Sequence, residues 1–245
     1  MTTRALRTQA RAEVAMTLRR GESLLLAIGI PVVLLGFFST VAVLPIPTGT
    51  AQRVDYLAPG ILALAIMSTG MVSLGIATAF ERSYGVLKRL GTTPLSRRDL
   101  LAAKIVGVLV VEALQVAVLV PLALALGWRP GAGGLAQGLA AALLATAAFS
   151  GLGLLLAGAL RAEAVLALAN GLYLVLLLLG GMVIPLDSLP RAVEVAARAL
   201  PSAALADALH ASLGRGDAVP AGAWLVLAIW AFATPTAAAL TFRWD

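Results

Sequence analysis

Cysteine is absent from the 245 residues, and histidine occurs once, at His210. Without cysteine the chain has no disulfide, no thiolate metal ligand and no cysteine nucleophile. A single histidine also argues against a histidine-based metal site within one chain. Cysteine chemistry is therefore excluded at the outset, and a histidine-based metal site is disfavoured.

Lysine is also rare, because only Lys88 and Lys104 occur. Neither stands in the G-x-x-x-x-G-K-[ST] pattern of an ATP-binding loop, so the chain is not expected to hydrolyse ATP by itself. There is no H-E-x-x-H zinc motif and no paired acidic motif for a metal-dependent lipid transferase. Ser150 and Gly151 superficially suit a membrane serine protease, but no histidine lies in an apolar stretch to activate Ser150. Close helix packing by small residues is the favoured interpretation of that pair.

Charged residues make up only 12% of the sequence, whereas 60% is hydrophobic and the mean hydropathy is +0.97. Six long stretches are uncharged apart from Glu112 in the third: residues 23–52, 56–80, 105–128, 130–160, 164–186 and 218–242. Each can hold the ~20 apolar residues that cross ~30 Å of hydrocarbon. The sequence therefore predicts an all-α integral membrane protein with six transmembrane helices, in a single domain over residues 1–245.

The basic residues are concentrated in residues 1–22 and 81–104, with Arg161 and Arg243 on the same predicted side. The other side carries equal numbers of basic and acidic residues. The positive-inside rule then places both termini in the cytoplasm of a multi-pass protein, expected in a bacterial plasma membrane. This distribution explains the net charge of +6 without nucleic acid as a partner. The first span is expected to stay uncleaved, because its apolar run is too long for a signal peptide.

The predicted spans cover about residues 24–44, 60–80, 97–126, 135–160, 164–184 and 224–240. Ser96 is expected to cap the third span, because Ser96 and Asp99 form an S-x-x-D capping box. Residues 4–20 favour a helix on the cytoplasmic surface, the alternative being a frayed basic tail. Residues 185–220 predict two short re-entrant or interfacial helices before the last span. Pro190 would open the first, and Ser202 would cap a second that ends at Gly214.

The connector between spans 2 and 3, residues 81–96, carries the most specific pattern. A short helix would present Tyr84, Leu87 and Leu90 as an apolar row before Gly91 and Pro94 end it. Such a row on a cytoplasmic elbow either binds a partner or packs against the inner ends of the spans. The spacing alone leaves both possibilities open.

The connector resembles that of the ABC-2 type permeases, the membrane subunits of one class of ATP-binding-cassette exporters. The matching positions are Glu81, Gly85, Leu87, Leu90, Thr93, Pro94, Leu95 and Ser96. A second match lies after span 5, in residues 180–186, followed by Leu189-Pro190 and Leu200-Pro201. The six-span layout also resembles this family, known as type V exporters, and the compact size resembles its drug-resistance subgroup. Ser83, Tyr84 and Lys88 depart from the family's acidic pattern, which implies a more cationic connector.

The resemblance implies a cytoplasmic ABC ATPase subunit as partner, with a second permease copy or a paralogous permease. Spans 1, 2 and 5 would largely form the interface between the two permeases. The partner would use ATP and Mg, and this chain would bind no cofactor and be no enzyme by itself. The residues implied in ATPase coupling are Glu81, Tyr84, Gly85, Leu87, Lys88, Arg89, Leu90, Pro94, Arg161 and Glu163. Arg7 and Arg11 of the surface helix would add contacts. The cargo would be a hydrophobic or amphiphilic compound, such as a drug or lipid, exported from the cytoplasm or inner leaflet.

Polar residues inside the spans are candidates for the substrate path. Glu112 would cost ~2.5–3.5 kcal/mol at the centre of a span, and such residues are functional by default. The alternative is a paired acid near the inner edge of the membrane. Gln115 shares its helix face, and Asn170 is either a substrate contact or an interhelical hydrogen bond. An ion-gradient-driven secondary transporter and a non-transport assembly protein remain the rival functions.

Overall fold

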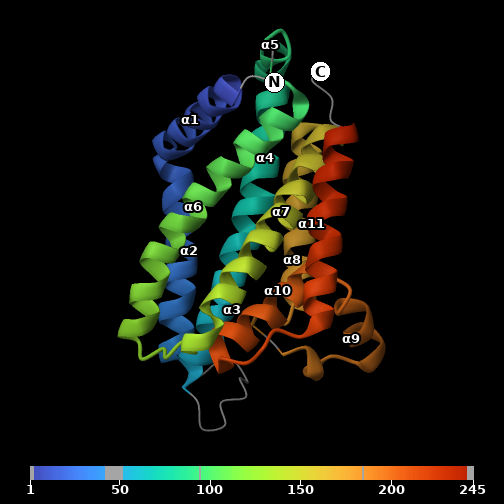
Figure 1. The fold of residues 1–245 in the computed structure, drawn as a ribbon. Coiled ribbons are helices and arrows are strands. Elements are labelled where there is room, and N and C mark those ends of the chain that lie inside the picture. Colours follow the sequence, from blue (N-terminus) through green and yellow to red (C-terminus); the bar gives the residue numbers. More distant parts are fainter. Residues whose placement is uncertain (1–2, 42–51, 94, 184, 242–245) are drawn as a thin grey trace.

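The computed structural model describes residues 3–41, 52–93, 95–183 and 185–241, and every regular element in these ranges is helical. Six helical segments of this part are long and apolar enough to cross a membrane, which confirms the expected fold class (Figure 1). They are α2 (Gly21–Thr40), the continuous segment α3–η1–α4 (Arg53–Ser83), α6 (Arg97–Ala125), α7 (Leu135–Ala159), α8 (Ala162–Leu179) and α11 (Ala221–Thr241).

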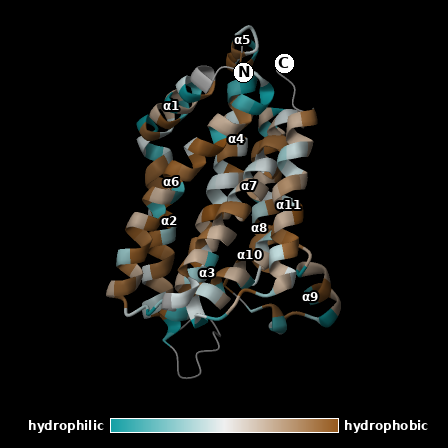
Figure 2. Cartoon of the chain, in the orientation of Figure 1, coloured by the Kyte–Doolittle hydropathy of each residue, from teal (hydrophilic) through white to brown (hydrophobic). Residues whose placement is uncertain are grey.

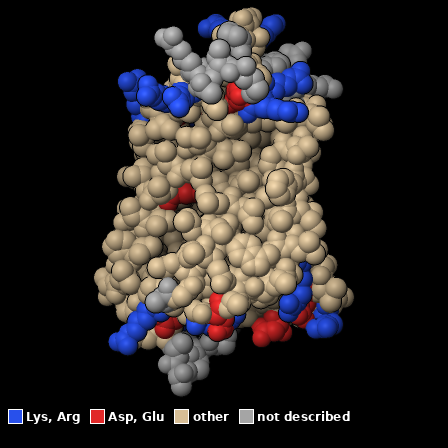
Figure 3. Space-filling model, viewed as in Figure 1, with Lys and Arg blue, Asp and Glu red and all other residues tan. Residues whose placement is uncertain are grey.

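Charge and hydropathy divide the bundle into three zones. Figure 3 shows Lys, Arg, Asp and Glu gathered at both ends, with a broad uncharged band between them apart from acidic atoms at mid-height. The helices are apolar over the same band (Figure 2). The end that carries the short helix α5 (Val86–Leu90) is called the connector end, and the opposite end is called the hairpin end. The uncharged band matches the requirement that only apolar side chains face hydrocarbon.

The second span forms the centre of the bundle. Of its most apolar stretch, 72% is buried, against 11% for α2 and 22% for α8. It consists of α3 (Arg53–Met67), the π-helical segment η1 (Ser68–Ser73) and α4 (Leu74–Ser83). Small residues allow neighbouring backbones to approach, since a Cβ at Gly75 would lie 3.0 Å from the carbonyl oxygen of Gly153 in α7. The centre therefore depends on close helix contacts as well as on apolar area.

Helix α1 (Thr3–Arg19) lies at the connector end and packs against α6 (Figure 1). Its apolar residues Leu6, Ala10 and Val14 are half-buried and Leu18 is exposed, whereas Glu13 is 7% exposed. The predicted apolar row is therefore not the most deeply buried part of this helix. Glu13 is buried more deeply, because Lys104 of α6 pairs with its carboxylate.

The hairpin end differs from the prediction in how deeply its helices lie. Helix α9 (Arg191–Ala197) follows Pro190 as expected, after the short turn η3 (Leu186–Ser188). The next helix, α10 (Pro201–Leu209), has Leu200 and not Ser202 at its N-cap, and it continues as the π-helix η4 (His210–Arg215). Its end is formed by Gly216 with φ 73°, not by Gly214. Alanines at 203, 204, 206 and 208 are all buried, so α10 packs inside the bundle against α3, α7 and α11.

Several predicted boundaries were wrong. Span 2 begins at Arg53 and not at residue 60, because Gln52 and Asp55 form a capping box and Pro59 does not end the helix. Span 5 ends at Leu179, because Gly180 and Gly181, the latter with φ 65°, turn the chain. Span 6 begins at Ala221. The predicted end of span 1 at residue 44, and Ile184 of the second motif, lie outside the described residues.

Candidate functional site

The connector is a bent elbow and not one helix over residues 81–90. Helix α4 ends at Ser83, and the chain reverses at Gly85, whose φ of 72° is a conformation that glycine adopts without strain. Helix α5 then covers Val86–Leu90. The hydroxyls of Thr92 and Thr93 donate to the carbonyl oxygens of Arg89 and Leu90 at 2.7 and 2.6 Å, which closes the end of α5.

The predicted apolar row does not lie on one exposed face. Tyr84 is 73% exposed, whereas Leu87 is fully buried and Leu90 is half-buried. Leu87 belongs to a cluster with Leu95 of the segment before α6 and with residues of α4, α6, α7 and α11: Leu74, Leu100, Leu101, Val108, Leu154 and Ala238. The packing alternative therefore holds for Leu87, whereas Tyr84 projects from the elbow, where a partner could reach it. Lys88 and Arg89 are exposed beside Tyr84, and Pro94 lies outside the described residues.

A buried ion cluster lies directly beneath the elbow. Lys104 of α6, which is 2% exposed, donates to Glu81 of α4 at 2.5 Å and contacts Glu13 of α1 at 3.4 Å. Arg20, at the start of α2, donates to the second carboxylate oxygen of Glu81 at 3.2 Å. We call Glu13, Arg20, Glu81 and Lys104 the connector cluster. It joins four helical elements through charges that would be costly to bury unpaired.

The sequence did not identify Glu13, Arg20 or Lys104 as site residues. Glu13 and Lys104 are 91 positions apart, so no local pattern pairs them. The available signal was that Glu13 is the single acid among residues 3–20 of a basic segment. An isolated acid in such a segment is a candidate for an inward-facing ion pair.

The turn between α7 and α8 lies next to the elbow. The guanidinium of Arg82 in α4 donates to the carbonyl oxygen of Leu160, which precedes Arg161. Arg161 and Glu163 are both exposed at this turn, and Arg7 and Arg11 are exposed on α1. The residues named for ATPase coupling thus lie at the connector end, except that Leu87 is inside and Pro94 is not described.

The three residues predicted for the substrate path, Glu112, Gln115 and Asn170, do not form one site. Glu112, which is 8% exposed, accepts a 2.6 Å hydrogen bond from the Thr146 hydroxyl of α7. Its other carboxylate oxygen has no partner among the described residues. Gln115 donates to the Ala27 carbonyl oxygen at 2.8 Å and to Thr69 at 3.0 Å. Asn170 is exposed and donates to Leu166 of its own helix, so it makes no interhelical bond within the described chain.

The hairpin end holds the single histidine in a packed site. The ring of His210 stacks on Tyr56 with centroids 4.3 Å apart, and its Nε2 donates to the Tyr56 carbonyl oxygen at 3.0 Å. The Tyr56 hydroxyl donates to Gly181 at 3.1 Å. Burial lowers the pKa of His210 from 6.5 to about 4. His210 is therefore held neutral and joins η4 to the start of span 2.

Replacing Lys104 with methionine tests the connector cluster. Lys104→Met leaves the Glu13 and Glu81 carboxylates without their shared cation, and removing one partner of a buried ion pair costs about 3–5 kcal/mol. Lys88→Met is the matched control, because it removes the other lysine at an exposed position. Thermal unfolding in detergent should show a much lower midpoint for Lys104→Met alone. Equal midpoints for the two variants would show that the cluster does not stabilise the fold.

The pH dependence of stability tests the His210 site. The unfolded chain binds a proton at His210 below pH 6.5, whereas the folded chain resists protonation until about pH 4. The free energy of unfolding should therefore fall as pH falls between these values, by about 3 kcal/mol at most. His210→Gln should remove this part of the pH dependence, as measured by the difference between the two unfolding curves. Parallel curves for both proteins would contradict the assignment.

Comparisons with known proteins agree with this architecture. The family model described as "ABC-2 type transporter" matches residues 4–213. The protein named "Putative transport permease YvfS" of Bacillus subtilis (strain 168) is 27% identical over 205 residues, which cover 80% of each chain. Six apolar spans together with the family match establish a multi-pass membrane protein. Since the family match covers most of the sequence, this chain belongs to the ABC-2 type transporter family.

Proposed function

We propose that the chain is the permease subunit of an ATP-driven exporter, moved by a separate ABC ATPase that docks on the elbow and uses ATP and Mg. The observation that carries this proposal is the different burial of Tyr84 and Leu87. Leu87 is fully buried and fixes the elbow to the bundle. Tyr84, which directly precedes the turn at Gly85, exposes its aromatic side chain. An exposed aromatic residue at a charged end of the molecule, away from the apolar band, is typical of a protein interface.

The elbow is built to pass on a displacement as a rigid unit. Helix α4 continues directly from the central span, and its Glu81 is held by Lys104 and Arg20. Leu87 packs among residues of four helices. Since packed elements shift as units and do not deform smoothly, movement of α5 by a partner would move the inner half of span 2.

The surrounding surface would extend the ATPase contact. Lys88 and Arg89 lie on the elbow, Arg7 and Arg11 on α1, and the Arg161–Glu163 turn is tied to α4 through Arg82. The exposed basic residues give this surface a cationic character, visible at the connector end in Figure 3. The matching ATPase surface would be acidic, since complementary charge steers association.

The connector end would face the cytoplasm of a bacterial plasma membrane, in keeping with the positive-inside rule. A second permease copy or a paralogous permease would complete the transporter. This proposal is supported by the low burial of α2 and α8. Only 11% and 22% of their most apolar stretches are buried within this chain, which leaves apolar surface for a second permease. The uncharged walls favour a hydrophobic or amphiphilic cargo, in the manner expected of a drug-exporting subgroup.

Tyr84→Ala tests the docking surface. Loss of an interface aromatic residue commonly costs 2 kcal/mol or more, so ATPase association should weaken about tenfold or more. Phe232→Ala is the matched control, because Phe232 is also 73% exposed but lies on α11 within a span. Copurification of the ATPase with each folded variant gives the readout. Undiminished association of Tyr84→Ala would refute the docking surface.

Glu112 is proposed as a contact on the substrate path, with Gln115 and Asn170 as secondary candidates. Its free carboxylate oxygen can bind a cationic group, and no cation contacts it in the described chain. Glu112→Gln keeps the shape and the Thr146 bond but removes the charge. In vesicles that hold the permease and its ATPase, transport of a cationic amphiphile should fall about tenfold, with a neutral amphiphile as control.

The same vesicles separate the exporter from an ion-gradient-driven transporter, the function that an isolated membrane acid would otherwise suggest. The exporter requires ATP and a functional ATPase at zero pH gradient. If transport needs no ATP, follows a pH gradient and is lost in Glu112→Gln, the chain is a secondary transporter and the exporter proposal is wrong.

A further inference from the structure

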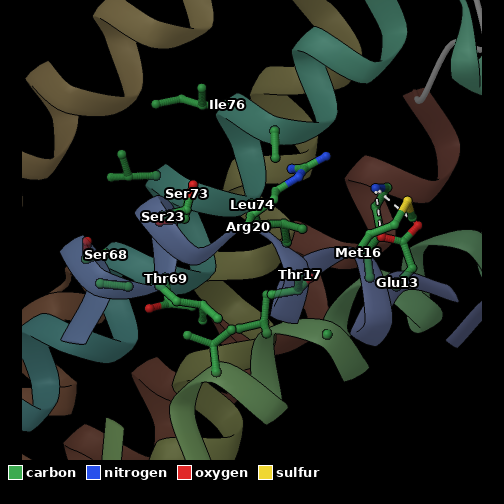
Figure 4. Close-up of a pocket in the computed structure, with 18 of the residues that line it drawn as sticks. Glu13, Met16, Thr17, Arg20, Ser23, Ser68, Thr69, Ser73, Leu74 and Ile76 are labelled. Carbon is green, nitrogen blue, oxygen red and sulfur yellow. Dashed lines mark hydrogen bonds and ion pairs between the residues drawn. The ribbon is translucent and has the colours of Figure 1, made fainter. Parts of the chain in front are cut away.

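A cavity of about 550 Å³ lies between α1, α2, the η1–α4 part of span 2, and α6 (Figure 4). This volume falls in the ~300–1,000 Å³ range of small-molecule sites. Glu112, Gln115 and Asn170 do not line it, although Gln115 donates hydrogen bonds to Ala27 and Thr69 of its wall. Its walls contain both the connector cluster and apolar side chains of the spans.

One part of the cavity is apolar and borders the exposed apolar surface of α2. Ala27, Val72 and Ile76 lie along its wall. Leu26 and Ile30 of α2 also line it, and they are 57% and 54% exposed. Exposed apolar side chains at this wall would let a hydrocarbon chain enter from the side. The π-helical segment η1 adds the hydroxyls of Ser68, Thr69 and Ser73 to this wall, and such segments are frequent at functional sites.

The polar part of the cavity has hydrogen-bond donors left over but no free carboxylate oxygen. Glu13 accepts from Gln9 and Lys104, and its two oxygens are both engaged. Glu81 accepts from Lys104 with one oxygen and from Arg20 with the other. The guanidinium of Arg20 has five N–H donors, is 47% exposed and, among the described residues, contacts the Glu81 carboxylate alone. The polar part of the cavity therefore has free N–H donors that can bind an added hydrogen-bond acceptor, and an anion is the strongest such acceptor.

We propose that the cavity binds one anionic phospholipid from the leaflet at the connector end. The phosphate lies at Arg20, and an acyl chain lies between α2 and the η1–α4 part of span 2. Phospholipid is favoured over a soluble anion because the cavity combines one cationic donor group with a predominantly apolar wall that opens to the lipid side. It is favoured over a cationic amphiphile because every carboxylate oxygen in the wall is already engaged.

The test measures the lipid that stays bound to the purified full-length chain. The protein is equilibrated in nanodiscs of phosphatidylglycerol or of phosphatidylcholine, extracted into mild detergent and weighed by native mass spectrometry. Wild type should retain one phosphatidylglycerol per chain. Arg20→Ala should reduce this retention about tenfold, the effect of losing charge-assisted hydrogen bonds.

Arg19→Ala is the matched control, because it removes an exposed arginine one position away that does not line the cavity. It should retain lipid like wild type. Ala77→Phe fills the apolar part and should abolish retention while Arg20 stays in place. Arg20→Lys keeps the charge with fewer donors and should give an intermediate value, which preserves the test if Arg20→Ala does not fold.

Three results would overturn the proposal: equal retention of phosphatidylcholine and phosphatidylglycerol, equal losses in Arg19→Ala and Arg20→Ala, or full retention in Ala77→Phe. Glycerol 3-phosphate, which has the phosphate but no acyl chain, should not displace the lipid. Displacement at millimolar concentration would reassign the cavity to a soluble phosphate compound. None of these measurements involves the ATPase or transport, so the exporter proposal stands or fails separately.

Discussion

The arrangement of the connector end depends on the ion pairs of Lys104. Its ammonium group is 2% exposed and lies between the carboxylates of Glu13 and Glu81. A lysine in that position is tolerated only when its charge is compensated, and each carboxylate has the same requirement. These ion pairs therefore hold α1, the inner end of span 2 and α6 in one relative position. Arg20 extends the constraint to the start of α2, so four elements share a single electrostatic junction.

This junction explains how a membrane protein can present a rigid surface outside the apolar band. Hydrocarbon provides little force to hold helices against one another, so packing of small residues and polar contacts must do so. In the centre, Gly75 and Gly153 allow span 2 and α7 to touch. At the connector end, the ion pairs and the Leu87 cluster take over that task. The elbow consequently projects from a firm base although α5 itself is short.

The number of spans and the extents of the third and fourth follow from the sequence, because length and lack of charge are properties of a contiguous stretch. The cap at Ser96 was predictable for the same reason, and its hydroxyl accepts from the Asp99 N–H at 3.1 Å. The start of span 2 was missed because the span was placed at residue 60, directly after Pro59. A Gln52–Asp55 cap places the first turn earlier, and the helix continues through the proline.

The candidate site was less predictable, because tertiary contacts decide it. A three-residue spacing showed that Tyr84, Leu87 and Leu90 were apolar but not which of them faced inward, and the reversal at Gly85 separates their directions. The pairing of Glu13 with Lys104, and the cavity beside it, join segments that are distant in sequence. The depth of α10 was missed because a run of alanines is compatible with a surface helix and with close packing in the interior.

The π-helical turn η1 sets the angular phase between the two halves of span 2. Such a turn accommodates one more residue than a regular α-helical turn, and each residue of an α-helix advances it by about 100°. If Ser68–Ser73 wound as regular α-helix with no residue removed, everything that follows would rotate by roughly that angle. Glu81 would then point away from Lys104, while α3 kept its own packing. The winding of one turn in the middle of the membrane thus determines the orientation of a contact surface several helical turns away.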